Sequence, residues 1–148
     1  MKSPGIKKIK IENKLGMRCV QNYQIYFRNV QLSKHSFLPD ARSFRKGVEV
    51  MLKDSRINVI YITFGVCLGV YRNTAAYVSK REQFGVPISS FQIMQMKLVD
   101  MMANIQAMAL VCERISNMSD NGELTTGIVS MFKAWATERA RKICRLGR

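Results

Sequence analysis

The segment from Arg81 to Gln95 carries the side chains whose types and order most clearly suggest a ligand. Arg81 provides a planar guanidinium, which suits a phosphate because it donates parallel hydrogen bonds to two oxygens. Phe84 adds an aromatic ring, while Gln83 and Gln92 add amides that both donate and accept hydrogen bonds. This segment also separates two apolar patterns of helical period, so its polar groups are expected at a junction between helices.

Other reactive residues do not form a recognisable site. The four cysteines lie far apart without a Cys-x-x-Cys pair, and His35 is the single histidine. This spacing favours neither a metal site nor a disulfide framework. Cys67 and Cys112 lie inside apolar helical patterns, so we expect both to be small buried thiols.

The charge balance is strongly basic, with 24 Lys and Arg against 10 Asp and Glu and a formal net charge of +14. Anionic partners are therefore expected, and nucleic acid is one candidate, resting on this charge and on the basic cluster in 139–148. The remaining basic residues are spread along the chain and form no RNA-binding motif or zinc finger.

An apolar content of 47% with three prolines is that of a globular chain. The longest apolar run, 59–70, is shorter than the roughly 20 residues of a membrane span.

Three regions are expected along the chain. Residues 1–33 contain short strand-like patterns, which are too little sheet to be stable alone. Residues 34–47 read as a linking loop. Residues 48–148 carry three helical patterns at about 48–79, 89–118 and 125–146.

The second helical pattern is the clearest, because its apolar residues recur at steps of three and four and predict one buried face. These residues are Met94, Leu98, Met101, Ile105, Met108, Cys112 and Ile115. Ser89 or Ser90 is the expected N-cap of this helix. In the first helix, Gly65 and Gly69 favour close packing against a neighbour. Three antiparallel helices with short connections predict a mainly α fold, a helical bundle.

Motifs in both halves of the chain resemble one family of flavoproteins, the acyl-CoA dehydrogenases and acyl-CoA oxidases. The matching motifs are Pro4-Gly5-Ile6, Asn13 to Arg18, Val20-Gln21-Asn22, Asn29-Val30, Leu38-Pro39, Arg81 to Gly85, Phe91-Gln92, Asn104 to Met108 and Lys133-Ala134-Trp135. They resemble the glutaryl-CoA dehydrogenase and short-chain peroxisomal acyl-CoA oxidase branch most closely. The resemblance implies the end of a central β domain, followed by an incomplete carboxy-terminal helical bundle.

The resemblance also implies a cofactor, FAD, and a substrate, an acyl-CoA that is dehydrogenated to the enoyl-CoA. Arg81 looks like the arginine that contacts the FAD diphosphate of a neighbouring subunit. Phe84 would pack near the adenine, and Gln83 and Gln92 would complete the cofactor contacts. Ser55 and Arg56 look like substrate-binding residues beside the acyl-CoA pocket. A homo-oligomer, built through the helical bundle, is the implied assembly, in peroxisomes or mitochondria.

No residue of the chain matches the family's catalytic base. In this branch the base is a glutamate in a Glu-Gly loop after the third helix, and the sequence ends at Arg148 before it. Some relatives place the base directly before the arginine that Arg56 resembles, where this chain has Ser55. Asp54 is turned about 100° away on a helix, and a serine is no proton acceptor without its own base. The expectation is a fragment of a flavin-dependent acyl-CoA oxidoreductase that is inactive alone. The alternatives are a non-catalytic helical module that assembles with full-length relatives, and a small basic nucleic-acid-binding domain.

Overall fold

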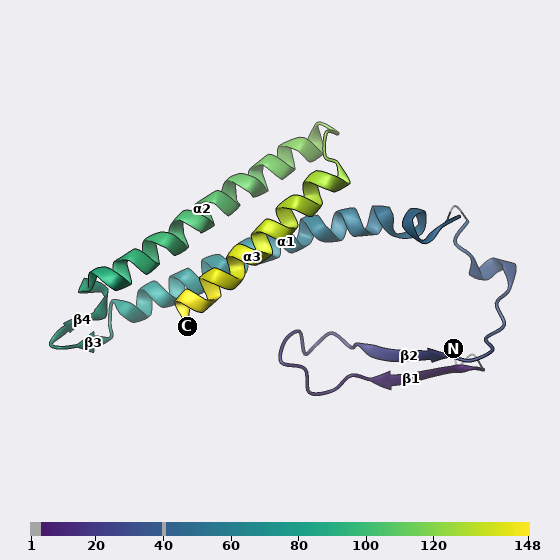
Figure 1. Cartoon of the computed structure of the whole chain (residues 1–148), viewed down its shortest axis with the longest axis horizontal. Helices are drawn as coiled ribbons and strands as arrows, with labels where there is room; N and C mark the ends of the chain where they lie inside the picture. The colour runs from purple at the N-terminus through teal and green to yellow at the C-terminus, as the bar shows by residue number, and fades with distance from the viewer. Residues whose placement is uncertain (1–3, 40) are drawn as a thin grey trace. The chain divides into compact units, whose positions relative to one another are not determined.

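The structure is a computed structural model that describes residues 4–39 and 41–148, and it is mainly helical (Figure 1). The chain divides into two compact units, Met1–Gly47 and Val48–Arg148. The first unit holds a small antiparallel sheet, and the second holds most of the helical residues. The predicted fold class, a helical bundle preceded by a short β segment, is confirmed.

The first unit contains a two-stranded antiparallel hairpin. Strand β1 (Ile6–Lys10) pairs with β2 (Tyr23–Phe27) in a register that places Ile6 opposite Phe27 and Lys10 opposite Tyr23. The strands contain isoleucine, tyrosine and phenylalanine, yet none of the described residues of this unit is buried. The hairpin is therefore held by its backbone ladder and by its loop rather than by a core.

Lys14 organises the loop that joins these two strands. Its Nζ donates hydrogen bonds to the carbonyl oxygens of Met17 (3.0 Å) and Val20, and to Oδ1 of Asn22. An ammonium group has three donors, so every one of them is used. This lysine belongs to one of the motifs that carried the family resemblance, and its role in the described chain is structural.

Helix α1 (Phe44–Val78) begins four residues earlier than the predicted start at Val48. The cause is Ser43, whose Oγ accepts a hydrogen bond from the backbone N of Lys46 (3.3 Å), as an N-cap serine does. A short 3₁₀ turn, Lys34–Ser36, interrupts the preceding connection. The predicted linking loop, residues 34–47, therefore contains this 3₁₀ turn at its start and the first turn of α1 at its end.

Helix α2 (Gln92–Asp120) starts later than expected, and the predicted capping role of Ser89 or Ser90 is wrong. Both serines belong to a 3₁₀ turn, Ile88–Ser90, and the N-cap residue is Phe91, which has no side-chain hydrogen bond to the helix. The side chain of Gln95 fastens this turn instead, because its Nε2 donates to the carbonyl oxygens of Ser89 (3.1 Å) and Ser90 (3.5 Å). Gln95 therefore holds the 3₁₀ turn against the start of α2 but does not cap the free N–H groups of the helix.

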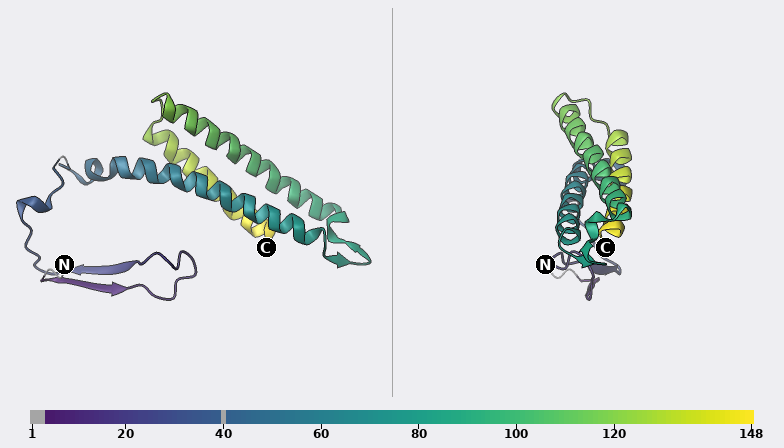
Figure 2. Two further views of the ribbon diagram at one scale, coloured as in Figure 1. Left: turned by 180° about the vertical axis from the view of Figure 1, so that it is seen from behind. Right: turned by 90° about the vertical axis from the view of Figure 1, so that its left-hand side faces the viewer.

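Helix α3 (Thr126–Gly147) follows a tight turn and agrees with the sequence pattern. Gly122 adopts a positive φ of 72° in this turn, a conformation that favours glycine. Thr125 then caps α3, since its Oγ1 accepts a hydrogen bond from the backbone N of Ile128 (3.3 Å). The two views in Figure 2 show the three helices side by side, with the yellow end of α3 beside the teal part of α1.

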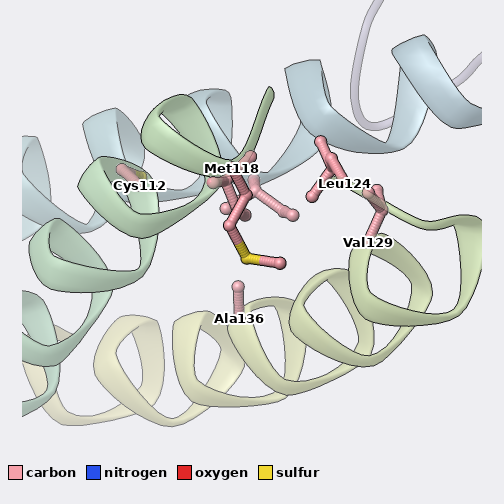
Figure 3. Packing of buried hydrophobic residues seen from close by; sticks show 7 residues of the cluster. Cys112, Met118, Leu124, Val129 and Ala136 are labelled. Atoms are coloured by element: carbon pink, nitrogen blue, oxygen red, sulfur yellow. The ribbon is translucent and has the colours of Figure 1, made fainter. Parts of the chain in front are cut away.

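The core of the helical unit consists of two apolar clusters. The first cluster lies near the turn between α2 and α3, and its buried residues are Ile60, Cys112, Ile115, Met118, Leu124, Val129 and Ala136. In Figure 3, Met118 extends from α2 toward Ala136 of α3. The second cluster lies toward the end of α3, and its buried residues are Cys67, Met101, Ile105, Met108 and Ile143. The predicted inward stripe of α2 supplies residues to both clusters, and the predicted burial of Cys67 and Cys112 is confirmed.

The outward faces of α1 and α2 remain apolar. Gly65 and Gly69 have open space where a Cβ would lie, so the predicted close packing at this glycine pair does not occur against any described residue of the chain. Ile62 and Val66 flank the glycines and are exposed, as are three large apolar residues of α2, Met96, Val99 and Leu110. None of the described helices is both long and apolar enough to cross a membrane.

Candidate functional site

The junction between α1 and α2 is a tight hairpin rather than a simple helical turn. Strand β3 (Glu82–Gln83) pairs antiparallel with β4 (Val86–Pro87). At the base of the hairpin, the backbone N of Ile88 donates to the carbonyl oxygen of Arg81 (2.8 Å). The backbone N of Arg81 in turn donates to the carbonyl oxygen of Tyr77 in the last turn of α1 (2.9 Å). Arg81 is therefore fixed at its backbone while its side chain stays exposed.

Phe84 occupies the tip of this hairpin in a conformation that phenylalanine rarely adopts. Its φ is +55° and that of Gly85 is +78°, as expected for a two-residue hairpin loop in which both residues are left-handed. A bulky residue with positive φ is uncommon, and such strain is often found at functional sites. The ring is 93% exposed and meets Phe91 edge to face, with centroids 6.1 Å apart and planes at 87°. An aromatic surface is thus presented to solvent at an energetic cost.

Arg81 has no acidic partner among the described residues. The ion pair between Lys142 and Asp100 (2.7 Å) is the only one in residues 4–39 and 41–148. Neither Arg81 nor Arg56 therefore forms an ion pair in this part of the chain. The guanidinium of Arg81 is available to an anion.

The start of α2 adds a second feature that suits an anion. Gln92 is the first residue of the helix and is exposed, and the first helical turn contains no acidic residue. The free backbone N–H groups at a helix start carry partial positive charge and bind anions. A shallow depression of about 420 Å³ runs along this part of the helix, and it is lined by Gln92, Gln95, Met96, Val99, Asp100 and Ala103. Cation, ring, amides and helix start therefore come from one stretch of 12 residues, which the hairpin and the 3₁₀ turn fold together.

Ser55 and Arg56 lie elsewhere, in the first half of α1. Arg56 is half-buried, and the Oγ of Ser55 donates a hydrogen bond to the carbonyl oxygen of Leu52 (3.2 Å). The hydroxyl is thereby engaged with its own helix. At 1.5 Å per residue, Arg56 lies about 33 Å from the end of α1. The structure does not bring this pair together with Arg81, so any site at Ser55 and Arg56 is separate.

The sequence pattern missed the hairpin at this junction and the role of Gln95. The signal for the hairpin is Gly85 between two short extended segments, since a glycine in such a position marks a tight loop. No comparable signal identifies Gln95, because its contacts with Ser89 and Ser90 depend on how the 3₁₀ turn meets the helix. A similar limit applies to Phe91, whose packing against Phe84 requires the closed hairpin.

Comparisons with known proteins agree with this architecture. Residues 46–147 match the family model described as "Acyl-CoA dehydrogenase, C-terminal domain". The chain is similar to the glutaryl-CoA dehydrogenase of Mycobacterium smegmatis, at 28% identity and a TM-score of 0.90, covering 98% of this chain and 37% of that one. It is also similar to the butyryl-CoA dehydrogenase of Megasphaera elsdenii, at 25% identity and a TM-score of 0.80, with 95% and 37% covered.

The chain therefore spans less than two fifths of the length of these relatives. A glutaryl-CoA dehydrogenase of M. smegmatis in complex with FADH2 shares the fold at 24% identity and a TM-score of 0.88, with 97% of this chain and 37% of that one covered. The family model extends over most of the chain, including all but the first two residues of α1 and the whole of α2 and α3. The chain belongs to the acyl-CoA dehydrogenase family.

Proposed function

We propose that residues 81–92 bind the diphosphate and adenine end of FAD, and that the chain is part of a flavin-dependent enzyme that dehydrogenates an acyl-CoA. The observation that carries the proposal is the junction itself: an unpaired Arg81, a strained and exposed Phe84, and a helix start without acidic residues. These three features match a ligand that is anionic at one end and aromatic at the other. When bound, FAD accepts a hydride from the β-carbon of the acyl-CoA.

Each residue has a distinct part in this proposal. Arg81 holds the diphosphate, and the exposed ring of Phe84 packs against the adenine while it keeps its edge-to-face contact with Phe91. Gln92 donates a hydrogen bond to the cofactor from the first turn of α2, and Gln83 contributes from β3. The choice of FAD as the cofactor is supported by a relative that shares the fold and is a complex with FADH2.

Ser55 and Arg56 are proposed to contact the acyl-CoA rather than the flavin. Arg56 supplies a positive charge for the anionic CoA portion or for an acidic acyl group. Because Arg56 lies far from Arg81, the two arginines can share a site only through a long ligand or through a neighbouring subunit. Ser55 is not a base, because its hydroxyl donates to the carbonyl oxygen of Leu52 and no carboxylate among the described residues accepts from it. We infer that the chain supplies cofactor and substrate contacts but no α-proton acceptor, so that it does not dehydrogenate an acyl-CoA alone.

The test is FAD binding by the chain, followed by flavin fluorescence or calorimetry, with Arg81→Ala compared with wild type. A hydrogen bond to a charged group contributes about 1.5–3 kcal/mol, so the expected loss is at least about tenfold in affinity. Arg81→Lys keeps the charge but loses the fork, and it should fall between the two. Arg141→Ala, which removes an exposed arginine of α3, is the matched control and should leave the affinity unchanged.

Two results would count against the proposal. A chain with full helical circular dichroism that takes up no FAD would remove the cofactor site. Equal losses in Arg81→Ala and Arg141→Ala would show that the flavin responds to overall charge rather than to this junction.

A second candidate function, a helical module that assembles with another copy or with a full-length relative, is favoured by the outward faces of α1 and α2. Their exposed apolar residues, Ile62, Val66, Met96, Val99 and Leu110, lie on helices that have no partner there among the described residues. Large apolar surface of this kind commonly marks an interface. Val99→Glu should then shift the chain toward monomer in light scattering, while Glu113→Lys, an exposed charge change on the same helix, should not.

A further inference from the structure

Gln95 makes the side-chain hydrogen bonds that tie the 3₁₀ turn to helix α2. It lies in the first turn of the helix, and its Nε2 donates to the carbonyl oxygens of Ser89 (3.1 Å) and Ser90 (3.5 Å). An amide nitrogen carries two hydrogens, so each carbonyl can take one of them. Among the described residues, no other side chain forms a hydrogen bond with residues 88–91.

These two bonds fix the peptide groups that lead into Phe91. The carbonyl oxygen of Ser90 and the backbone N of Phe91 belong to one planar peptide group, so a bond that holds the oxygen also orients the N–H. That N–H donates to the carbonyl oxygen of Ile88 (3.2 Å). The carbonyl oxygen of Phe91 accepts from the backbone N of Gln95 (3.1 Å). Phe91 is therefore held by the turn before it and by the helix after it.

Phe91 connects this arrangement to the tip of the hairpin. Its ring is half-buried and meets the exposed ring of Phe84 edge to face, with centroids 6.1 Å apart. The same turn closes the base of the hairpin, because the backbone N of Ile88 donates to the carbonyl oxygen of Arg81 (2.8 Å). A continuous series of contacts thus runs from Gln95 through the 3₁₀ turn to Arg81 and Phe84.

Gln95 also affects the charge at the start of α2. Phe91 is the N-cap residue and has no side-chain oxygen for the first N–H groups of the helix, so these groups can serve an anion. The carbonyl oxygens of Ser89 and Ser90 carry partial negative charge within three residues of these groups. Because the Gln95 amide donates to both oxygens, it reduces a charge that opposes a phosphate.

We propose that Gln95 is a positioning residue of the cofactor site, which sets the place of Phe91 and through it that of the Phe84 ring. This inference rests on the proposed function, FAD binding at residues 81–92. A neutral hydrogen bond at an exposed turn contributes little to the stability of the whole fold. The loss of the Gln95 amide should therefore be evident in the order of the turn and in the affinity for FAD.

The first experiment needs no ligand and uses amide hydrogen exchange of the full chain, followed by NMR. Gln95→Met keeps the side-chain length and the helix preference but removes both donors. It should speed exchange of the Phe91 N–H about fivefold, because the peptide group before Phe91 is no longer held. Gln106→Met is the matched control, since Gln106 is also exposed on α2, and it should leave this exchange unchanged.

Flavin titration of the same variants measures the effect on the site. Gln95→Met should weaken FAD binding about fivefold, with an unfolding midpoint within about 3 °C of wild type. Gln106→Met should bind as wild type does. Gln95→Lys supplies new donors to the two carbonyls and should recover the affinity to within about twofold of wild type. Gln106→Lys adds the same charge elsewhere on α2 and should not change the affinity.

A double-mutant cycle identifies the route of the effect. In a Phe91→Leu background, Gln95→Met should cost less than about twofold in further affinity, because the ring that Gln95 positions is already absent. A full fivefold loss in that background would show that Gln95 contacts the ligand directly and would overturn the positioning role.

Failure of this inference differs from failure of the cofactor site. If the chain bound FAD in a manner that depends on Arg81, but Gln95→Met bound it equally well, the role of Gln95 would be wrong and the site would stand. Unchanged exchange of the Phe91 N–H in Gln95→Met would also overturn that role. If the folded chain took up no FAD, both the site and the role of Gln95 would be wrong.

Discussion

Phe84 combines two features that stability alone does not select, a left-handed backbone and an almost fully exposed ring. A bulky residue with positive φ costs about 1–2 kcal/mol. Asparagine tolerates this conformation better, so Phe84→Asn relieves strain while it removes the edge-to-face contact with Phe91. That contact is worth about 0.5–1.5 kcal/mol, and less at an exposed position, so the two effects should nearly cancel.

We therefore expect Phe84→Asn to leave the unfolding midpoint within about 3 °C of wild type and to weaken FAD binding about tenfold. Thermal unfolding and flavin titration on the same samples would separate the two properties. A comparison with Phe91→Leu would show whether the supporting ring matters for the fold. If Phe84→Asn bound FAD as wild type does, the exposed ring would have no role in the cofactor site.

Cys67 makes the stability of the helical unit depend on pH. Burial raises its pKa from 9.0 to about 11, so the folded chain keeps the proton that the unfolded chain releases above pH 9. Its stabilising effect is fully present below pH 9 and is lost as pH rises from 9 to 11. Two pKa units correspond to about 2–3 kcal/mol. Denaturant unfolding under reducing conditions should show a fall in the free energy of unfolding between pH 8 and pH 10.5. This fall should be larger in wild type than in Cys67→Ala.

The difference between wild type and Cys67→Ala is the informative quantity, because lysines and tyrosines also titrate in this range. It should be largest at pH 8 and shrink toward pH 10.5. A difference that stays constant would mean that the thiol does not titrate differently in the folded and unfolded states. The same variant removes buried volume, so it should be less stable than wild type at pH 8.

At the scale of the elements, two glycines in helices have opposite surroundings. Gly65 on α1 has open space around a potential Cβ, whereas Gly147 on α3 lies against Val70 and Thr74. Gly65→Ala should stabilise the chain by about 0.5–1 kcal/mol, since alanine is the better helix former. Gly147→Ala should destabilise it by about 1–3 kcal/mol, because a methyl group has to displace packed side chains. Denaturant unfolding of both variants provides the comparison.

The same pair also tests the outward face of α1. If Gly65→Ala destabilised the chain at high concentration and stabilised it at low concentration, the face would be packed against a second molecule. Equal effects of both substitutions would mean that the close approach at Gly147 is absent in solution.

The sequence predicted the helices better than it predicted their ends. Apolar residues at steps of three and four along α2 identify its buried face, since burial imposes that period directly on the residue types. The ends depend on single polar contacts that the apolar pattern does not reveal. Ser43 caps α1 ahead of the apolar pattern, whereas Ser89 and Ser90 belong to a 3₁₀ turn and do not cap α2. Among the candidate site residues, Arg81, Gln83 and Phe84 belong to one hairpin, and Gln92 follows it at the start of α2. Ser55 and Arg56 lie about 33 Å away along α1, a separation that becomes evident only once residues 44–78 form one continuous helix.

For the molecule as a whole, charge and burial are distributed unequally between the two units. Residues 1–47 carry eleven Lys and Arg against two Asp and Glu, and none of the described residues among them is buried. Residues 48–148 contain all thirteen buried apolar residues of the part of the chain that the structure describes. Regions with few buried contacts open at little cost in free energy. A two-stranded hairpin without a covered face is marginally stable in water.

Limited trypsin digestion should therefore cut first within residues 7–46 and leave a fragment that contains α1, α2 and α3. The helical unit also has exposed Lys and Arg, so the difference reflects local opening rather than the presence of cleavage sites. We expect cleavage of the first unit to be at least about tenfold faster. Chymotrypsin, which would use Tyr23, Tyr26 and Phe27 in the same region, should give a fragment with a similar start. First cleavage inside α2 or α3 would show instead that the helical unit is the less stable part. If the first unit were protected only at high protein concentration, its exposed strands would be covered by a second molecule.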